Sequence, residues 1–315
     1  MPPPYRHLFG PVHSRRFGRS LGVDLQAAGA KQCSLNCVFC QLGPTASTTV
    51  ERRAQIPLAE VLAELRDWRQ GGGTADFVTL SGNGEPTLHP DFGRVLDWAR
   101  REHLRSLLLS NGTLFPLPEV RAVAARADVV KLSMHAWDQD SFQRIVRPHP
   151  ALRFEEIAES YARFRSEYRG ELAIEVFVVP GINDRPEDMS RIAARLRKIE
   201  PDRIQLNHAA RAPAEPDVRP VDANALRRLS LLFHPPAELP GDVPPASDTV
   251  PRTDDELGAA VTALVSRHPA SLPSLAATFG CETVRMDRLL RRLQQNGSIT
   301  LTSREGVPYA EASHD

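Results

Sequence analysis

Cysteine is scarce in this 315-residue chain, which has only four. No apolar run approaches the roughly 20 residues that a transmembrane helix needs, so the sequence predicts no membrane span. The N-terminal Met-Pro-Pro-Pro-Tyr-Arg-His has neither the apolar core nor the cleavage site of a signal peptide, which predicts a cytoplasmic protein. The formal net charge is zero, which argues against a protein built globally around nucleic acid.

Three of the four cysteines lie within eight positions, at Cys33, Cys37 and Cys40. Three thiolates on one short loop converge on a single soft metal centre. The spacing C-x3-C-x2-C suits a [4Fe–4S] cluster whose fourth iron has no protein ligand. An open coordination position is typical of catalytic metal sites rather than structural ones.

Two other interpretations of these cysteines are weaker. A structural zinc site wants four Cys or His ligands, usually in two separated pairs, and the remaining cysteine, Cys281, lies far downstream. A disulfide is disfavoured by the odd number of thiols and by the missing secretory segment. Cys281 is most simply a small buried hydrophobic residue.

The cysteine motif, with Phe39 just before its last cysteine, resembles the signature of the radical S-adenosylmethionine (SAM) superfamily. The segment Gly82-Asn-Gly-Glu-Pro-Thr87 resembles the glycine–glutamate–proline segment of that superfamily. Two further phrases, residues 9–24 and 205–215, look like a subgroup related to the wyosine-type, tRNA-modifying members. Wyosine-type enzymes with a second cluster need further cysteines, which the N-terminal region lacks, so a different reaction is expected.

The resemblance implies two cofactors, a [4Fe–4S] cluster held by Cys33, Cys37 and Cys40, and SAM chelated to the open iron. It also implies an external electron donor of the flavodoxin or ferredoxin type. The expected cofactor-binding residues come from the signature segments and from strand ends: Phe39, Gly82, Gly84, Glu85, Pro86, Ser110, Asn111, Ser133, Gly181 and Gln205. Catalytic residues cannot be read from the pattern, and the candidates at strand ends are His135, Asn207 and Arg211.

The fold class predicted from the sequence is α/β. Apolar stretches that read as strands alternate with amphipathic stretches that read as helices, in six successive units between residues 17 and 207. Such a series predicts a parallel sheet with right-handed crossovers. Eight units would close a full barrel, and six fit the partial (β/α)6 TIM-like barrel of radical SAM enzymes.

The expected domains are a radical SAM partial barrel over residues 1–213, a Pro-rich linker with one helix over 214–253, and a winged-helix-like domain over 254–315. The last interpretation comes from three amphipathic helices followed by a hairpin pattern. Residues 254–315 hold six arginines and no lysine against eight acids, which disfavours duplex DNA as the target.

These observations predict a radical SAM enzyme that acts on an unidentified substrate, with RNA or a peptide ahead of a small metabolite. The rival hypothesis is an iron–sulfur regulator that senses redox state and binds nucleic acid through the winged helix. The glycine–glutamate segment and the polar strand ends argue against this rival, because a sensor needs no SAM pocket.

Overall fold

The computed structural model describes residues 5–14, 17–27, 31–209, 214–215, 217–239, 253–266, 269–304 and 307–313. A seven-stranded sheet runs through its larger part in the order β1 to β7. The strands are β1 (Leu8–Ser14), β2 (Gly18–Val23), β3 (Phe77–Leu80), β4 (Arg105–Leu109), β5 (Val129–Ser133), β6 (Glu171–Phe177) and β7 (Arg203–Asn207). Strands β2 to β7 are parallel, and β1 pairs antiparallel with β2.

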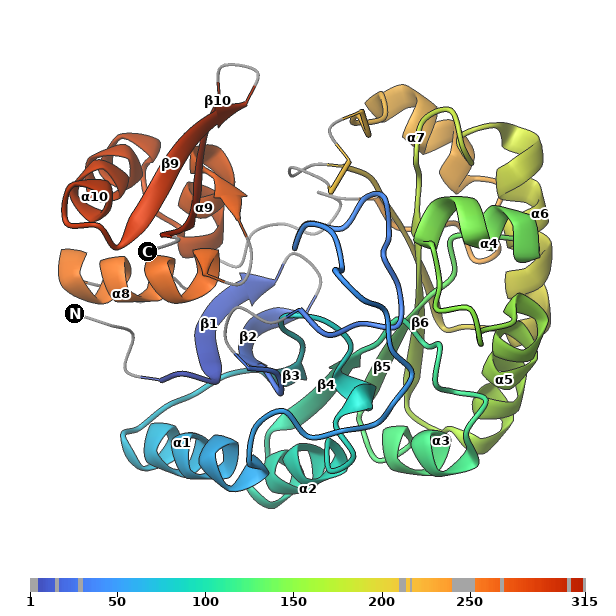
Figure 1. Cartoon of the computed structure of the whole chain (residues 1–315), viewed down its shortest axis with the longest axis horizontal. Helices are drawn as coiled ribbons and strands as arrows, with labels where there is room; N and C mark the ends of the chain where they lie inside the picture. Colours follow the sequence, from blue (N-terminus) through green and yellow to red (C-terminus); the bar gives the residue numbers. More distant parts are fainter. Residues whose placement is uncertain are drawn as a thin grey trace.

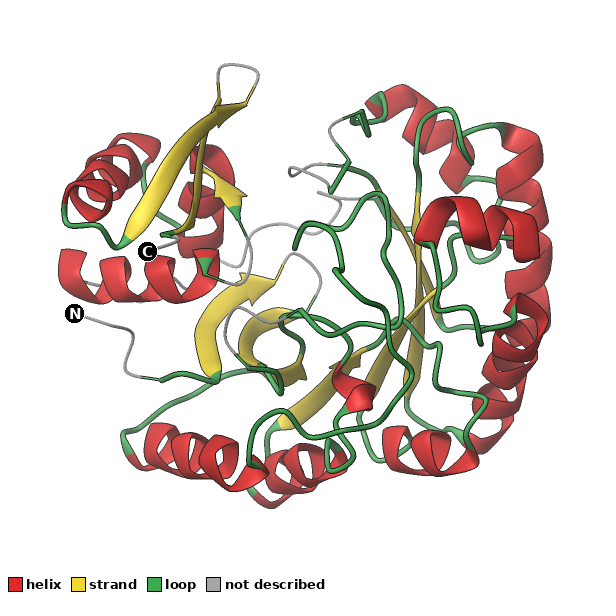
Figure 2. Ribbon diagram, in the orientation of Figure 1, coloured by secondary structure: helices red, strands yellow, loops and turns green. Residues whose placement is uncertain are grey.

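Helices cover the outer face of this curved sheet, and long loops lie across the mouth that faces the viewer in Figures 1 and 2. The helices are α1 (Leu58–Gln70), the 3-10 helix η1 (Pro86–Leu88), α2 (Gly93–Arg101), α3 (Pro118–Ala124), α4 (Gln139–Val146), α5 (Phe154–Glu167), α6 (Pro186–Ile199) and α7 (Ala223–Ser230). The six parallel strands, each followed by at least one helix, confirm the predicted partial (β/α)6 barrel.

The inside of the barrel is apolar at the end where the strands begin. Phe17, Phe77, Leu107 and Val129 form a small cluster there, separate from the main core between sheet and helices. Side chains of a strand alternate between two faces, so positions two residues further along β4 and β5 also point inward. The strand starts therefore close the bottom of the barrel, and the strand ends are left for polar groups.

Strand β1 and helix α4 were not expected from the sequence. Strand β1 extends the sheet at its edge before the first parallel strand. Helix α4 lies between β5 and α5, where Asp138 caps it through its side chain and Ser141 completes the capping box.

Much of the predicted linker packs on the barrel. Within 217–239, side chains of and after α7 are buried in the main core, including Leu226, Leu229 and Phe233. The backbone of Glu238 pairs with β7, because its N–H donates to Ile204 O (2.8 Å) and its carbonyl accepts from Leu206 N (3.0 Å). The domain boundaries at 213 and 253 stay predictions, and this packing indicates that residues 217–239 belong with the barrel core.

The C-terminal part has its own core and a small sheet in the order β8–β10–β9. Its elements are α8 (Asp254–Val265), β8 (Ala270–Ser271), α9 (Leu272–Phe279), α10 (Thr283–Gln295), β9 (Ile299–Arg304) and β10 (Val307–Ala312). Three helices and a hairpin match the expected order, and the winged-helix assignment stays a prediction. Phe9 of β1 is buried in this core, so the module packs against the edge of the barrel sheet.

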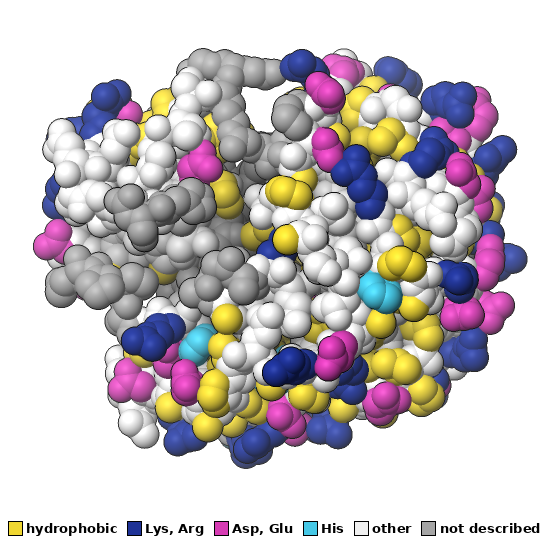
Figure 3. All heavy atoms as spheres, in the orientation of Figure 1, with side chains coloured by type: hydrophobic (Ala, Val, Ile, Leu, Met, Phe, Trp, Pro, Cys, Tyr) yellow, Lys and Arg dark blue, Asp and Glu magenta, His cyan; other side chains and the backbone are white. Residues whose placement is uncertain are grey.

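The charged side chains on the face of the molecule in Figure 3 are of both signs and are interspersed. No helix in the described part of the chain is long and apolar enough to cross a membrane.

Candidate active site

The three clustered cysteines lie on the long loop between β2 and α1, at the end of the barrel where the parallel strands finish. Backbone hydrogen bonds hold the middle of this loop against α4. Asn36 N–H donates to Val146 O (2.9 Å) and Val38 N–H to Ile145 O (3.1 Å), both at the end of α4. Residues 36–38 are therefore held by a helix that the sequence pattern did not predict.

Two of the three sulfur atoms accept a hydrogen bond. The Lys31 ammonium donates to Cys40 Sγ at 3.1 Å, and the Asn111 amide donates to Cys33 Sγ at 3.4 Å. Burial, and to a smaller extent the Glu85 carboxylate, raise the pKa of the Cys33 thiol to about 12. Burial also raises the pKa of Cys37 well above its usual range. Metal binding must therefore displace protons from these thiols.

Within the described ranges, no three His, Cys, Asp or Glu side chains are placed to share one metal ion. A tetrahedral zinc site would need its ligands close around a single centre, at about 2.3 Å for each sulfur. A [4Fe–4S] cluster is different, because each iron takes its own thiolate and the sulfurs stay further apart. Three thiols on one loop, two of them with donors on their sulfurs, fit the cluster better than zinc.

The glycine segment lies directly against the start of the cysteine loop. Gln32 and Gly84 form a parallel bridge, in which Gln32 N–H donates to Asn83 O (3.2 Å) and Glu85 N–H donates to Gln32 O (2.9 Å). A Cβ on Gly84 would overlap with the Gln32 carbonyl oxygen. Glycine is thus required here for the approach of two backbone segments of the protein itself.

Gly82 makes a similar close approach to a side chain. A Cβ at this position would overlap with the carboxylate of Asp24, which follows β2. Asp24 also accepts from Asn83 N–H at 3.3 Å and from Gln26 N–H at 3.1 Å. Sequence reasoning gave Asp24 no role, although its place directly after the first parallel strand could have indicated one.

Glu85 is buried, and its carboxylate accepts four hydrogen bonds. Oε1 accepts from Thr87 N (3.0 Å), Thr87 Oγ1 (2.6 Å) and Ser110 Oγ (2.7 Å), and Oε2 accepts from Asn111 N (2.7 Å). Burial raises the pKa of Glu85, and these hydrogen bonds act in the opposite direction. The carboxylate therefore joins the glycine segment to the end of β4, and contact with SAM stays a prediction for it.

Ser110 and Asn111 lie where the sequence placed them, at the end of β4, and both contact the signature segments. The Asn111 amide also donates to Ser34 Oγ at 3.0 Å, while its oxygen accepts from Thr113 N–H at 3.0 Å. Asn111 thus contacts both Glu85 and the cysteine loop. Pro86 is buried at the start of η1, directly after the capping residue Glu85.

An aromatic group connects the cysteine loop to the ends of β5 and β6. Phe39 stacks on Phe177, with ring centroids 4.0 Å apart, and meets His135 edge-on at 4.9 Å. His135 Nδ1 accepts from Phe177 N–H at 2.9 Å, so the neutral ring carries its proton on Nε2. Burial lowers the pKa of His135 to about 4, which keeps the ring neutral at pH 7.

A charged pair inside the barrel was missed by the sequence reasoning. Lys131 on β5 and Glu175 on β6 form a salt bridge of 2.6 Å, and each side chain is 16% exposed. Asn207 on β7 donates to the same Glu175 oxygen at 3.5 Å. Both charged groups act on the pKa of His135, which places them near its ring. A polar residue at every second position of an apolar strand was the available signal.

The remaining predicted site residues that the structure describes have hydrogen-bond partners outside the cysteine loop and the glycine segment. Gly181 is exposed in the turn after β6, and its N–H donates to Asp184 at 2.9 Å. Gln205 is fully buried and donates to Glu238 at 3.2 Å. Ser133 is half-buried at the end of β5, where its carbonyl accepts from Tyr161 at 2.9 Å. Arg211 lies outside the described residues.

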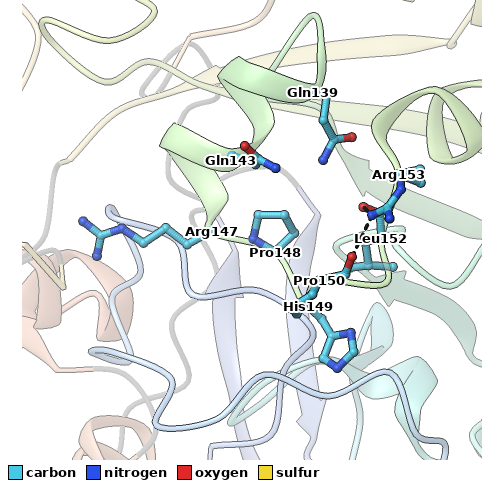
Figure 4. A pocket seen from close by; sticks show the side chains of 8 residues that line it. All are labelled: Gln139, Gln143, Arg147, Pro148, His149, Pro150, Leu152 and Arg153. Carbon is cyan, nitrogen blue, oxygen red and sulfur yellow. Dashed lines mark hydrogen bonds between the residues drawn. The ribbon is translucent and has the colours of Figure 1, made fainter.

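A pocket of about 550 Å³ opens beside the cysteine loop (Figure 4). Its lining residues come from α4 and from the connection to α5: Gln139, Gln143, Arg147, Pro148, His149, Pro150, Leu152 and Arg153. None of these eight lining residues carries a carboxylate. Arg147 extends toward one rim and pairs with Glu215, whereas Arg153 donates to Pro150 O at 2.7 Å. The pocket shares backbone with the cysteine loop, because His149 N–H donates to Ser34 O at 2.9 Å.

We expect Gly84→Ala to prevent assembly of the cysteine loop. The new methyl group must separate Gln32 from Gly84, and the loss of two backbone hydrogen bonds costs at least about 2 kcal/mol. Iron and sulfide content after anaerobic reconstitution, together with urea unfolding, measure the effect. Gly43→Ala is the matched control, because that glycine also has a positive φ (+75°) but no atom within 4 Å of the added carbon. Equal iron content in the two variants would contradict the close-packing argument.

We expect His135 to make the folded state sensitive to acid. Its pKa is about 4 when folded and about 6.5 in an unfolded chain, so between these values the unfolded state binds more protons. The free energy of unfolding should therefore fall by about 3 kcal/mol as the pH falls from about 6.5 to about 4. Urea unfolding of the metal-free protein measures this loss, and His135→Asn, which keeps an acceptor for Phe177 N–H, should lack it. An imidazole NMR signal that titrates near pH 6.5 would show that this reasoning fails.

Comparison with known proteins agrees with this geometry. The family model described as the radical SAM superfamily matches residues 30–196. A UPF0026 protein of Helicobacter pylori is 35% identical over 230 residues, which cover 72% of this chain and 73% of that protein. A Brachyspira hyodysenteriae protein named GTPase Obg is 29% identical over 300 residues, and the match spans 93% of this chain but only 43% of that protein.

Among solved structures, a radical SAM methyltransferase from Sphaerobacter thermophilus superimposes with a TM-score of 0.52 at 21% identity, covering 70% of this chain and 65% of that one. At this level of identity the likeness concerns the fold. The family match covers the cysteine loop, the glycine segment and the strands β3 to β6. The chain therefore belongs to the radical SAM superfamily.

Proposed function

We propose that this enzyme generates a 5′-deoxyadenosyl radical at the mouth of its partial barrel and uses it to remove a hydrogen atom from an RNA substrate. The observation that carries the proposal is the joining of the cysteine loop, the glycine segment and the end of β4 through Glu85 and Asn111. As a radical SAM protein it uses a [4Fe–4S] cluster and SAM. When bound and reduced, these supply one electron to a carbon–sulfur bond, which releases methionine and the radical.

The residues of the chain have separable tasks in this proposal. Cys33, Cys37 and Cys40 hold the cluster, and the fourth iron is left for SAM. Phe39, stacked on Phe177, closes the apolar side of the site and excludes water from the radical. The neutral His135 ring has an Nε2 proton to donate to the substrate or cofactor. Enzymes of this superfamily need an external reductant, and we propose a flavodoxin- or ferredoxin-like donor.

Lys131, Glu175 and Asn207 are the proposed substrate contacts inside the barrel. An ion pair that is mostly buried is weak evidence for stability, because the desolvation cost of the two charges offsets their attraction. The Lys131 ammonium has three N–H donors, and one of them binds Glu175. This arrangement can hold a polar group of a substrate near His135 and Phe39, on the inner side of the cysteine loop.

RNA is favoured over a peptide by the pocket of Figure 4. Within the described residues, His149 Nε2 makes no hydrogen bond. The Arg153 guanidinium donates only to backbone carbonyls there, so its other N–H groups are available to a ligand. Arg147 pairs with Glu215, which leaves the Arg153 guanidinium as the cation of the pocket, and a guanidinium suits phosphate oxygens. Because the backbone of the pocket is bonded to the cysteine loop, a polymer bound there would enter the barrel mouth close to the cluster.

The alternative function, an iron–sulfur regulator that binds nucleic acid through the C-terminal module, has less support. Phosphate contacts by this module would need its arginines, including those of α10. Arg285 pairs with Asp254 at 2.7 Å, and Arg292 pairs with Asp255 at 3.2 Å, so acids of α8 bind both guanidinium groups. These two side chains would have to leave their partners before they could contact phosphates.

We expect reconstituted protein with a strong reductant to convert SAM into methionine and 5′-deoxyadenosine, as measured by chromatography. Cys33→Ala, Cys37→Ala and Cys40→Ala should each lower this turnover at least about 100-fold, because a cluster that has lost a ligand does not position SAM. Cys281→Ala is the matched control and should keep wild-type turnover, since Cys281 packs in the C-terminal core. Wild-type protein with full iron content and no turnover would refute the proposal.

We expect Arg153→Glu to weaken RNA binding about 10-fold or more and to reduce its salt dependence, because one phosphate contact is replaced by repulsion. Fluorescence anisotropy with RNA that copurifies with the protein, at several salt concentrations, provides the measurement. Arg163→Glu, on the exposed face of α5, is the charge-matched control. Equal binding by both variants, or copurification of a peptide that transfers deuterium to 5′-deoxyadenosine, would favour a peptide substrate.

A further inference from the structure

Lys31 has a position that the proposed radical chemistry does not itself explain. Lys31 precedes the cysteines, and its ammonium lies at the C-terminal end of their loop, 3.1 Å from Cys40 Sγ and 2.5 Å from the carbonyl oxygen of Gly43. Within the described ranges, no carboxylate pairs with it. Its positive charge is therefore directed at a cluster ligand rather than neutralised by an acid of the protein.

The three sulfurs differ in the donors that reach them. Cys40 has a charged donor, Cys33 has the neutral amide of Asn111 at 3.4 Å, and Cys37 has no side-chain donor within the described part of the chain. Hydrogen bonds to cluster sulfurs and nearby charge are the groups by which a protein sets the potential of an iron–sulfur centre. Lys31 combines both in one side chain.

The direction of the effect follows from charge. One-electron reduction takes a [4Fe–4S] cluster from the 2+ to the 1+ state and makes the cluster with its three thiolates more negative by one unit. A half-buried cation within hydrogen-bonding distance of a ligand sulfur stabilises the more negative state, and the partly water-excluded surroundings strengthen this attraction. The added electron comes from the external donor, and no proton is needed for balance.

We propose that Lys31 raises the reduction potential of the cluster held by Cys33, Cys37 and Cys40, so that the external donor can reduce it. Lys31 is a positioning residue in this role, because it acts through the Cys40 sulfur. The inference rests on the proposed function only in requiring that these cysteines hold the cluster. It does not depend on the substrate.

The test is a redox titration of the reconstituted full-length protein without SAM, followed by EPR of the reduced cluster. In Lys31→Met, we expect the ratio of reduced to oxidised cluster at the wild-type midpoint to fall about 10-fold, which corresponds to about 59 mV for one electron. Lys31→Arg, which keeps the charge and the donors, should stay near wild type. Lys198→Met, which removes an exposed lysine of α6, is the matched control and should leave the midpoint unchanged.

An unchanged midpoint in Lys31→Met with full iron content would overturn the proposal. If Lys31→Met does not take up iron, the same titration is made on Lys31→Gln, which keeps an N–H donor and loses the charge. A midpoint in Lys31→Gln more negative than in Lys31→Arg supports the proposal, and equal midpoints in these two variants refute it. Because the redox titration contains neither SAM nor substrate, the midpoint can be interpreted even if the protein fails to cleave SAM.

Discussion

The buried carboxylate of Glu85 is the interaction on which the site depends. It accepts hydrogen bonds from Thr87, from Ser110 and from the Asn111 backbone, and its own N–H donates to Gln32. One side chain thus fixes the glycine segment, the end of β4 and the start of the cysteine loop. A buried carboxylate is costly unless it is fully hydrogen-bonded, so a change in any one of these segments affects the others.

Both glycines of the glycine segment have a role within the protein itself. Sequence reasoning assigned Gly82 and Gly84 to cofactor binding. That role stays a prediction. The structure places Asp24 against Gly82 and the Gln32 backbone against Gly84, so these internal contacts already require glycine. Motif residues that are expected to touch a cofactor can equally serve to shape the loop that does.

The repeating part of the fold could be predicted from the sequence because its signal is local. Alternating apolar strands and amphipathic helices depend on side chains within a few positions of each other. Strand β1 was not predictable in this way, since Phe9 packs into a core formed mostly by residues beyond 253. Helix α4 was missed because its start, Asp138 to Ser141, has the composition of a turn, and the capping box there is what makes it helical.

The sequence predicted where the candidate site lies better than it predicted which residues form it. Cysteine spacing and strand ends identified Cys33, Glu85, Asn111 and His135 as members of one region. The Lys131–Glu175 pair joins two strands that are separated by two helices in the chain, so no short pattern contains both partners. Sequence reasoning did not identify Lys31, because its contact with Cys40 depends on how the loop folds back.

The packing of the C-terminal module on β1 connects it physically with the site. Phe9 lies in the core of that module, and its neighbour Leu8 belongs to the barrel core, so one strand is shared between the two hydrophobic clusters. Strand β1 pairs with β2, whose end leads into Asp24 and so to the glycine segment. An otherwise exposed sheet edge is covered in this way, which removes a site for unwanted strand pairing. The module is therefore joined to Asp24 through the pairing of β1 with β2.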